Sequence, residues 1–290
     1  MTVLALQRVS IDDFDTGCRT TRLFIAADSR ISREEVTTTD IAPKILPINM
    51  SAGDAYGNRW QFAPYGFAFA GSVNAALLTH SVAEHLLTNL FGPKGIAPPS
   101  VQEVAEIYRE AARQQIVEIG ARLSLDYANA ALFDAIVCGY SIDSKEVCAF
   151  SVEARLGAEL DVQVKEIDTQ AGIFTIGAGK KRFDEIKRIM IESGGEPFCI
   201  NVIDKMIKNS EHPTVGGHIQ AATIDSSGFH QLTILDFSDD QQLGRSRYLN
   251  IDMNDIPRPQ GYKFGQMGIT LDGPTAEKLA SQGNLMHTDH

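Results

Sequence analysis

The sequence lacks any cluster of lysine and arginine residues, any long apolar run and any cleavable signal pattern at its start. Its 26 basic residues are outnumbered by 37 acidic residues, which gives a formal net charge of -11. A chain of this charge without a basic patch is a poor partner for nucleic acid and for anionic membranes. The missing apolar run and signal pattern predict that no segment spans a membrane.

Cysteine is scarce, and its four positions are scattered: Cys18, Cys138, Cys148 and Cys199. Two of them lie in apolar runs, where a thiol serves as a small hydrophobic group. Nothing in this arrangement points to a disulfide framework. The sequence therefore predicts a reduced, cytoplasmic protein.

Several common catalytic and binding patterns are also missing. The G-x-S-x-G elbow of serine hydrolases is absent, and Gly177 to Lys180 lacks the full spacing of a phosphate-binding loop. His80 and His85 are five residues apart, which places them on different sides of a helix and argues against a zinc site. We therefore expect neither a metal nor another cofactor.

At 290 residues and 43% hydrophobic content, the chain can bury one large core or two modest ones. Period-two patterns predict strands at residues 2–9, 23–27, 44–48, 65–70, 133–140, 146–152, 172–177, 218–224 and 230–235. Apolar residues recur every four positions from Leu78 to Leu90 and predict a helix that begins at Ser72 and ends before Gly92. Ser100 with Glu103 forms a capping-box pattern for a second helix, and two more helices are predicted at 181–192 and 197–208.

This order of elements predicts an α+β protein with a four-layer αββα sandwich, in which two antiparallel sheets face each other beneath helical layers. Residues from 237 onward are polar and rich in Asp, Gln, Gly and Pro. We therefore predict one domain over 1–236 and a polar C-terminal extension or arm over 237–290.

The first predicted strand begins with Met1-Thr2-Val3. Removal of Met1 leaves Thr2 with a free α-amine beside its own hydroxyl. The α-amine of an unstructured peptide has a pKa of about 7.7–8.0, so that a useful fraction is a free base near neutral pH. Nucleophile and base can then belong to one residue.

Three further features follow in order. One strand ends in Asp28-Ser29-Arg30, Lys44 opens another strand sixteen residues after Asp28, and a third runs through Gly71 into a helix. Taken singly, each of these residues would be an ordinary structural residue. Together behind Met-Thr, they resemble the proteasome β-type subunits, including the bacterial HslV-type and Anbu-type relatives, and the resemblance covers residues 2–90 best.

The resemblance implies an Ntn-hydrolase fold and a site with defined roles. Thr2 would be the nucleophile, and Lys44 would supply positive charge beside it. Asp28 would orient Lys44, the N–H of Gly71 would contribute to an oxyanion hole, and Arg30 would order the strand end. The residues that would surround the side chain before the cut bond are all apolar: Ile31, Ala42, Leu46, Phe69, Val73 and Leu77.

The sequence departs from the family at three supporting positions. The family has a serine inside the glycine pair before the third helix, and an aspartate and a serine before the late glycine pair. Here these positions are Ala178, His212 and Val215. In the family such groups support the threonine amine and its water, so the resemblance leaves a slow or an inactive enzyme among the alternatives.

Three functions are consistent with these features. The main prediction is a threonine-type peptidase subunit of a self-compartmentalising, proteasome-like complex that cleaves peptides or unfolded proteins. The alternatives are an Ntn amidohydrolase that acts on a small amide and a catalytically inactive structural ring subunit. The apolar circumference of the 72–91 helix predicts self-association into stacked homo-oligomeric rings, and the sequence identifies no unfoldase that would feed them.

Overall fold

The computed structural model of this chain describes residues 2–12, 19–33, 36–122, 129–210, 212–236, 245–249, 251–253, 255–260 and 267–270. The predictions that concern Met1, Cys18 and most of the 237–290 extension lie outside these residues. Within them the chain mixes helices with antiparallel sheets, so the predicted α+β class is confirmed. The described helices are α1 (Val73–Leu87), α2 (Val101–Arg122), α3 (Lys180–Glu192) and α4 (Cys199–Lys208). None of them is long and apolar enough to cross a membrane.

The larger sheet contains eight of the described strands in the order β13-β1-β2-β14-β15-β16-β17, and β18 pairs with β15 in parallel. Their bounds are Leu4–Asp12 (β1), Arg19–Asp28 (β2), Ile173–Ile176 (β13), Ile219–Asp225 (β14), Gly228–Asp236 (β15), Arg245–Tyr248 (β16), Ile251–Asp252 (β17) and Met267–Thr270 (β18). β1 and β2 pair from Leu4 with Ala27 to Asp12 with Arg19, so the first hairpin has longer strands than its sequence pattern predicts.

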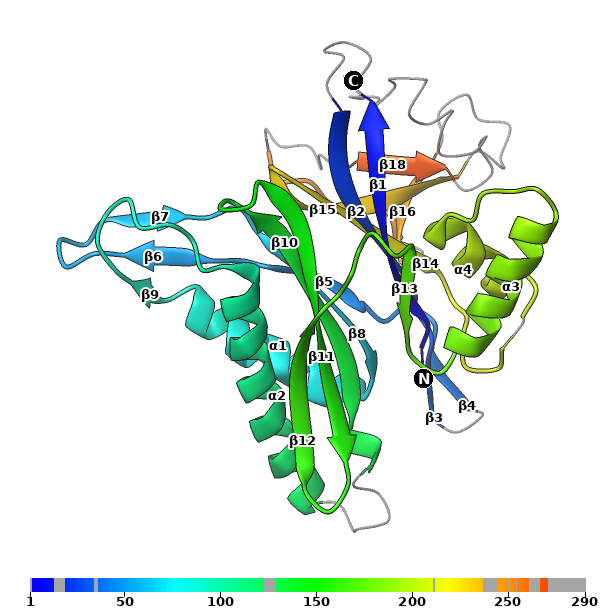
Figure 1. Cartoon of the computed structure of the whole chain (residues 1–290), viewed down its shortest axis with the longest axis horizontal. Helices are drawn as coiled ribbons and strands as arrows, with labels where there is room; N and C mark the ends of the chain where they lie inside the picture. Colours follow the sequence, from blue (N-terminus) through cyan, green and yellow to red (C-terminus); the bar gives the residue numbers. More distant parts are fainter. Residues whose placement is uncertain are drawn as a thin grey trace.

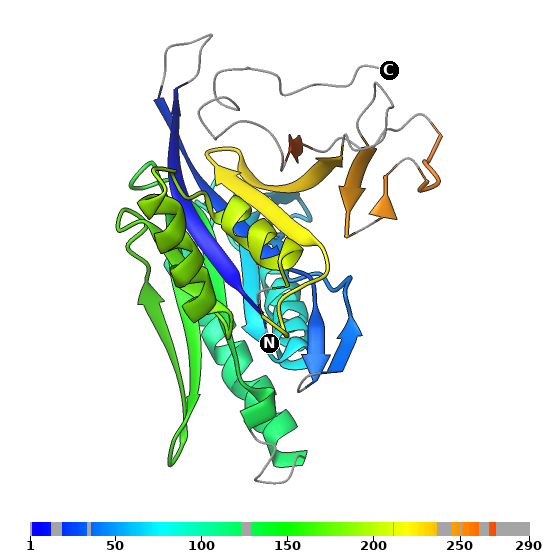
Figure 2. The ribbon, with the colours of Figure 1, turned by 90° about the vertical axis from the view of Figure 1, so that its right-hand side faces the viewer.

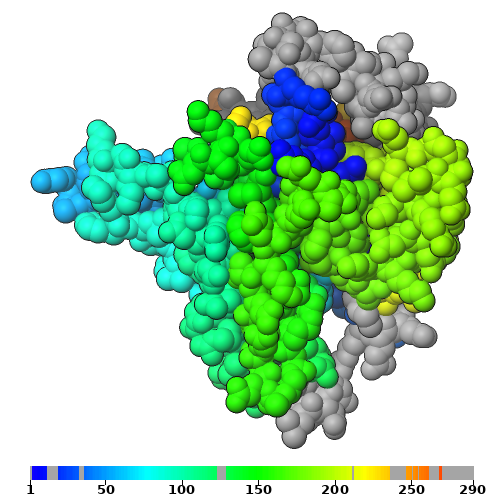
Figure 3. Space-filling model, viewed as in Figure 1, coloured from blue at the N-terminus to red at the C-terminus, as the bar shows by residue number. Residues whose placement is uncertain are grey.

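The second sheet is antiparallel throughout, in the order β12-β11-β10-β8-β5. Its strands are Ile45–Ile48 (β5), Tyr65–Gly71 (β8), Phe133–Ser141 (β10), Glu146–Leu156 (β11) and Leu160–Glu166 (β12). Two small sheets complete the described strands: β3 (Ile31–Arg33) with β4 (Val36–Thr39), and β7 (Arg59–Gln61) with β6 (Ser51–Gly53) and β9 (Leu90–Phe91). The β6–β7 hairpin projects from the body at the left of Figures 1 and 3.

Strand β8 shows why these residues form the centre of a layered protein. Phe67 and Phe69 belong to the apolar cluster that includes α1 and α2, whereas Ala68 and Ala70 belong to the cluster between the two sheets. Successive side chains of a strand point to opposite faces, and here both faces are covered. The strand is therefore apolar at nearly every position and does not alternate with polar residues.

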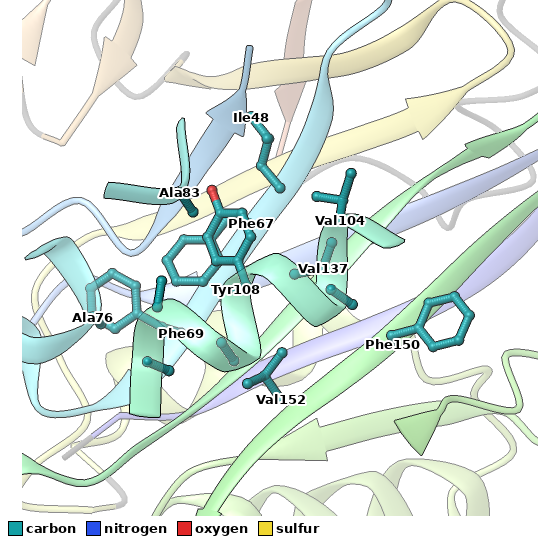
Figure 4. Close-up of a cluster of buried hydrophobic side chains, with 14 of the residues drawn as sticks. Ile48, Phe67, Phe69, Ala76, Ala83, Val104, Tyr108, Val137, Phe150 and Val152 are labelled. Atoms are coloured by element: carbon teal, nitrogen blue, oxygen red, sulfur yellow. The ribbon is translucent and has the colours of Figure 1, made fainter. Parts of the chain in front are cut away.

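Three apolar clusters hold the described elements together. The first lies between α1, α2 and the β5–β8–β10–β11–β12 sheet, where the rings of Phe67 and Tyr108 stack with centroids 4.8 Å apart (Figure 4). The second lies between the two sheets, and the third lies between the larger sheet and α3 and α4. Figure 2 shows α4 lying over the strands of the larger sheet.

Helix α1 is shorter than predicted. It ends at Leu87, where the Asn89 side chain donates to the carbonyl of His85 at 2.7 Å and the Asn89 N–H donates to the carbonyl of Leu86 at 3.1 Å. The side chain satisfies a carbonyl that the Asn89 N–H would have bonded in a continuing helix. The predicted stop at Gly92 was therefore wrong by one turn, and residues 90–91 form β9 instead.

The capping box of α2 is confirmed. The Ser100 N–H donates to Glu103 Oε2 at 2.7 Å, and the Glu103 N–H donates to Ser100 Oγ at 3.2 Å. Strands β3, β4, β6, β7, β9 and β12 had no predicted counterpart, since most of them are only two to four residues long. Three short strands within 237–290 extend the larger sheet, and the boundary at residue 237 stays a prediction.

Candidate active site

The ammonium group of Lys44 lies at the centre of a buried polar cluster. It donates hydrogen bonds to Thr2 Oγ1, to Asp28 Oδ1 at 3.0 Å and to the carbonyl oxygen of Arg30 at 2.6 Å. Thr2 is 3% exposed, Lys44 1% and Asp28 0%. An ammonium has three N–H donors, and these three acceptors use all of them.

The two sheets bring these groups together from separate strand ends. Asp28 is the last residue of β2, and its carboxylate accepts the N–H of Val3 at 3.1 Å, just before β1 begins. Lys44 directly precedes β5 in the other sheet. The start of β1 also lies close to the β3–β4 hairpin in Figure 1. The cluster thus forms where the ends of strands from both sheets meet.

Asp28 accepts hydrogen bonds on both carboxylate oxygens. Oδ1 accepts from the N–H of Val3 and from Lys44, and Oδ2 accepts from the N–H groups of Arg30 and Gly216, both at 3.2 Å. Burial raises the pKa of the Asp28 carboxyl, and the attraction of Lys44 and these donors opposes that shift. The carboxylate is therefore held in one orientation, with one oxygen aimed at Lys44.

Burial lowers the pKa of Lys44 below its ordinary value, while the nearby Asp28 carboxylate favours the charged ammonium. A lysine with a lowered pKa loses its proton at a lower pH than a solvated lysine does. It also places a positive charge beside the hydroxyl of Thr2. These are the properties of a group that stabilises a developing negative charge on an oxygen.

Arg30 contacts the cluster through its main chain. Its carbonyl accepts from Lys44, while its guanidinium forms a forked ion pair with Asp40, with Nε–Oδ1 2.7 Å and Nη2–Oδ2 3.2 Å. The hydrogen bonds from Arg30 lower the pKa of Asp40. Asp40 directly follows β4, so this pair connects the end of β2 to the far end of the β3–β4 hairpin.

Gly71 ends strand β8 with φ at +121°, a conformation that side chains disfavour. A Cβ there would lie 2.7 Å from the carbonyl oxygen of Leu132 and from Cα of Phe133. Gly177 has φ at +95°, and a Cβ on it would collide with the carbonyl oxygen of Thr2 and approach Ala70 Cβ to 3.1 Å. Ala70, near the end of β8, and the backbone of Thr2 therefore both lie against Gly177.

The six predicted pocket residues fall into two groups. Leu46, Phe69, Val73 and Leu77 share the apolar cluster beneath α1 and α2. Ile31 begins β3, directly after Arg30, and the N–H of Ala42 donates to the carbonyl of Ser29 at 3.0 Å. The second group thus adjoins Asp28 and Lys44 along the chain.

The three departures from the family pattern have ordinary structural surroundings. Val215 is buried in the apolar cluster that includes Val3 and α4, and Ala178 is exposed. His212 Nδ1 pairs with the hydroxyl of Thr214 at 3.0 Å. Sequence reasoning missed Gln220, whose buried side chain bonds to the main chain on both sides of the site. A glutamine inside the otherwise apolar run 219–222 was the signal for it.

No group of three histidine, cysteine, aspartate or glutamate side chains is placed to hold a metal ion within the part of the chain that the structure describes. The groups that the cluster itself offers for chemistry are a hydroxyl, an ammonium and a carboxylate.

No protein-family model matches the chain, and no curated protein matches it. Among solved structures, it is similar to an Anbu (Gly-1) mutant from Hyphomicrobium sp. strain MC1, with 15% identity and a TM-score of 0.49 over 80% of this chain and 85% of that one. It is also similar to Anbu (ancestral beta-subunit) from Yersinia bercovieri, with 14% identity and a TM-score of 0.48 over 80% and 87% of the two chains. Both of these neighbours are Anbu proteins.

Proposed function

We propose that this chain is a threonine peptidase of the N-terminal-nucleophile type, with Thr2 as its nucleophile after removal of Met1. The observation that carries the proposal is the buried hydrogen bond from Lys44 Nζ to Thr2 Oγ1. Lys44 Nζ also donates to Asp28 Oδ1, which orients the ammonium. A lysine and a carboxylate that are buried together beside a single hydroxyl are typical of an activated nucleophile. The motifs around these residues support the same function.

In the proposed reaction, the free α-amine of Thr2 accepts the proton of the Thr2 hydroxyl as Oγ1 attacks the peptide carbonyl. The positive charge of Lys44 favours the unprotonated amine and stabilises the negative charge that develops. The N–H of Gly71 would donate to the oxyanion. Collapse of the tetrahedral intermediate breaks the C–N bond, and the amine returns its proton to the leaving group. Water then hydrolyses the acyl-threonine ester.

We further propose the four-layer αββα arrangement of the Ntn hydrolases. The three apolar clusters support it, because each lies between one pair of successive layers: helices and sheet, sheet and sheet, sheet and helices. The free thiols of Cys138, Cys148 and Cys199 are in keeping with a cytoplasmic location, which we also propose.

Self-association into rings is part of the proposal. Leu78, Val82 and Leu86 are 48%, 38% and 53% exposed, and they follow one another at four-residue spacing along α1. The core face of the same helix carries smaller residues such as Ala75, Ala76 and Ala83. A contiguous apolar stripe of this kind is typical of a contact surface. We infer that neighbouring copies cover it.

A catalytically inactive ring subunit is the second candidate, and one observation favours it. Val215, which replaces the serine of the family pattern, lies in an apolar cluster and offers no hydroxyl to the Thr2 amine. Intact-mass measurement before and after treatment with a covalent inhibitor directed at N-terminal threonine separates the two candidates. We expect loss of Met1 and addition of one inhibitor. A chain that retains Met1 and takes up no inhibitor is a scaffold subunit.

A further inference from the structure

Gln220 is a polar side chain buried between the two sheets. It lies on β14, opposite Ala27 of β2, and is 1% exposed. All seven residues of β14 except the last are buried, and Gln220 is flanked by Ile219 and Ala221. Burying an amide among apolar side chains is unfavourable unless its donors and acceptor are hydrogen-bonded.

Every polar group of the Gln220 amide finds a main-chain partner at the site. Its Oε1 accepts the N–H of Lys44 at 2.9 Å, and its Nε2 donates to the carbonyls of Ala42 at 2.8 Å and Asp28 at 3.2 Å. The orientation of the amide follows from these partners. The N–H of Lys44 requires an acceptor, and the two carbonyls require donors.

The main chain of Lys44 is consequently held from two sides. Gln220 of the larger sheet binds its N–H, and the N–H of Phe69 in the second sheet donates to its carbonyl at 3.1 Å. Its side chain then extends to Thr2, Asp28 and Arg30. Gln220 also binds the carbonyl of Asp28, so a single side chain connects the backbones of both members of the buried ion pair.

We propose that Gln220 is a positioning residue for the reaction proposed above: it fixes the separation between the Lys44 and Asp28 backbones and thereby places the ammonium against the Thr2 hydroxyl. This inference rests on the proposed function. The described hydrogen bonds of the Gln220 side chain all go to main-chain atoms of Ala42, Lys44 and Asp28, so it acts through the backbone. Misplacement of a catalytic group by about 1 Å can lower a rate about 100-fold.

The test compares the purified wild-type chain with Gln220→Leu, which keeps the volume and removes all three hydrogen bonds. Gln220→Met takes its place if the leucine variant does not fold. kcat and KM are measured on a fluorogenic peptide, and the titration of the Lys44 side chain is followed by NMR in lysine-labelled protein, with Lys44→Arg identifying the signal. We expect kcat to fall about 100-fold with little change in KM. We also expect Lys44 to titrate closer to the ordinary lysine value.

Gln231→Leu is the matched control. Gln231 lies on the neighbouring β15, and its Nε2 donates to the carbonyl of Ala221 at 2.7 Å. Ala221 directly follows Gln220 in sequence, but Gln231 itself has no described bond to Lys44. This variant should keep wild-type kcat and the wild-type Lys44 titration, whatever its melting temperature. If the wild-type chain cleaves no peptide, the proposed function fails and the Lys44 titration alone decides the inference. An unchanged Lys44 titration in the Gln220 variants, or an equal loss of kcat in Gln231→Leu, overturns it.

Discussion

Lys44 Nζ lies 3.0 Å from Asp28 Oδ1, and both side chains are almost completely removed from solvent. In the protein interior, a charge destabilises the folded state unless it is paired and fully hydrogen-bonded. Here the lysine has three acceptors and the carboxylate has four donors. One of the acceptors is the hydroxyl of Thr2, which connects this pair to the proposed chemistry.

Replacement of Thr2 tests the nucleophile directly. Thr2→Ala should abolish peptide hydrolysis and inhibitor labelling while leaving the fold intact, because only a hydroxyl and a methyl group are lost. Thr2→Ser keeps the hydroxyl and the amine and should retain measurable turnover. Hydrolysis of a fluorogenic peptide and intact mass after inhibitor treatment provide the measurements. If Thr2→Ala kept wild-type turnover with contaminating peptidases excluded, Thr2 would be ruled out as the nucleophile.

Lys44→Ala should lower kcat nearly as much as Thr2→Ala, because the two groups act as a unit and their losses do not add. It should also destabilise the fold by about 3–5 kcal/mol, since it leaves Asp28 buried without its partner. Asp28→Asn should lower both kcat and stability, because it leaves the Lys44 ammonium buried without its counter-charge. Arg155→Ala, which breaks an exposed ion pair with Asp134, is the control and should cost only about 0–1 kcal/mol. Urea unfolding gives the stabilities, and equal losses in Lys44→Ala and Arg155→Ala would contradict the buried pair.

The pH dependence of kcat/KM should have two limbs. Activity should rise as the Thr2 amine loses its proton, and this acid limb should lie below the ordinary α-amine range of about 7.7–8.0, because the charge of Lys44 favours the unprotonated amine. It falls again when Lys44 loses its proton, and burial lowers the pKa of Lys44, so this alkaline limb should lie below the ordinary lysine range. Lys44→Arg keeps its charge at all accessible pH values and should lack the alkaline limb in whatever activity remains. If Lys44→Arg showed an alkaline limb at the same pH as the wild-type chain, that limb would belong to a group other than Lys44.

Substrate preference tests the six apolar residues that are predicted to surround the side chain before the cut bond. A bulky hydrophobic side chain before the cut bond should be favoured over a charged one, and enlarging the space with Leu77→Ala should shift the preference toward larger side chains. Single contacts of this kind discriminate by about 1–3 kcal/mol, or roughly 10–200-fold in kcat/KM. Profiling with a fluorogenic peptide library measures both effects. A preference for acidic or basic side chains would show that a different set of residues forms the pocket.

The apolar stripe of α1 should hold the assembly together. Leu86→Lys and Val82→Lys should shift the light-scattering mass from a ring toward the 31.6 kDa monomer, because a lysine buried in an apolar contact loses its hydration. Val117→Lys on α2 replaces another exposed apolar residue outside the stripe and should leave the mass unchanged. A wild-type chain that is monomeric at working concentration would contradict the ring.

Local patterns were enough to predict much of the order of elements. The period-two strands, the capping box of α2 and the amphipathic α3 and α4 could be recognised because each depends on residues that are neighbours in sequence. The resemblance to the proteasome β-type subunits, and not a local pattern, singled out Asp28 and Lys44 as a pair before their geometry was known. The short strands β3, β6, β7 and β9 escaped notice, since segments of two to four residues carry too little pattern.

The sequence by itself determined which groups are available for chemistry: a threonine hydroxyl, a lysine, an aspartate and a glycine at the end of a strand. Only the tertiary structure decided that Thr2, Asp28 and Lys44 meet, because their contact depends on the pairing of β1 with β2 and on how the two sheets face each other. The same long-range packing decided that Gln220 connects the sheets at that point and that α1 buries its alanines and leaves Leu78, Val82 and Leu86 exposed. Contacts between residues far apart in sequence leave no local pattern, so no periodicity or spacing could have predicted them.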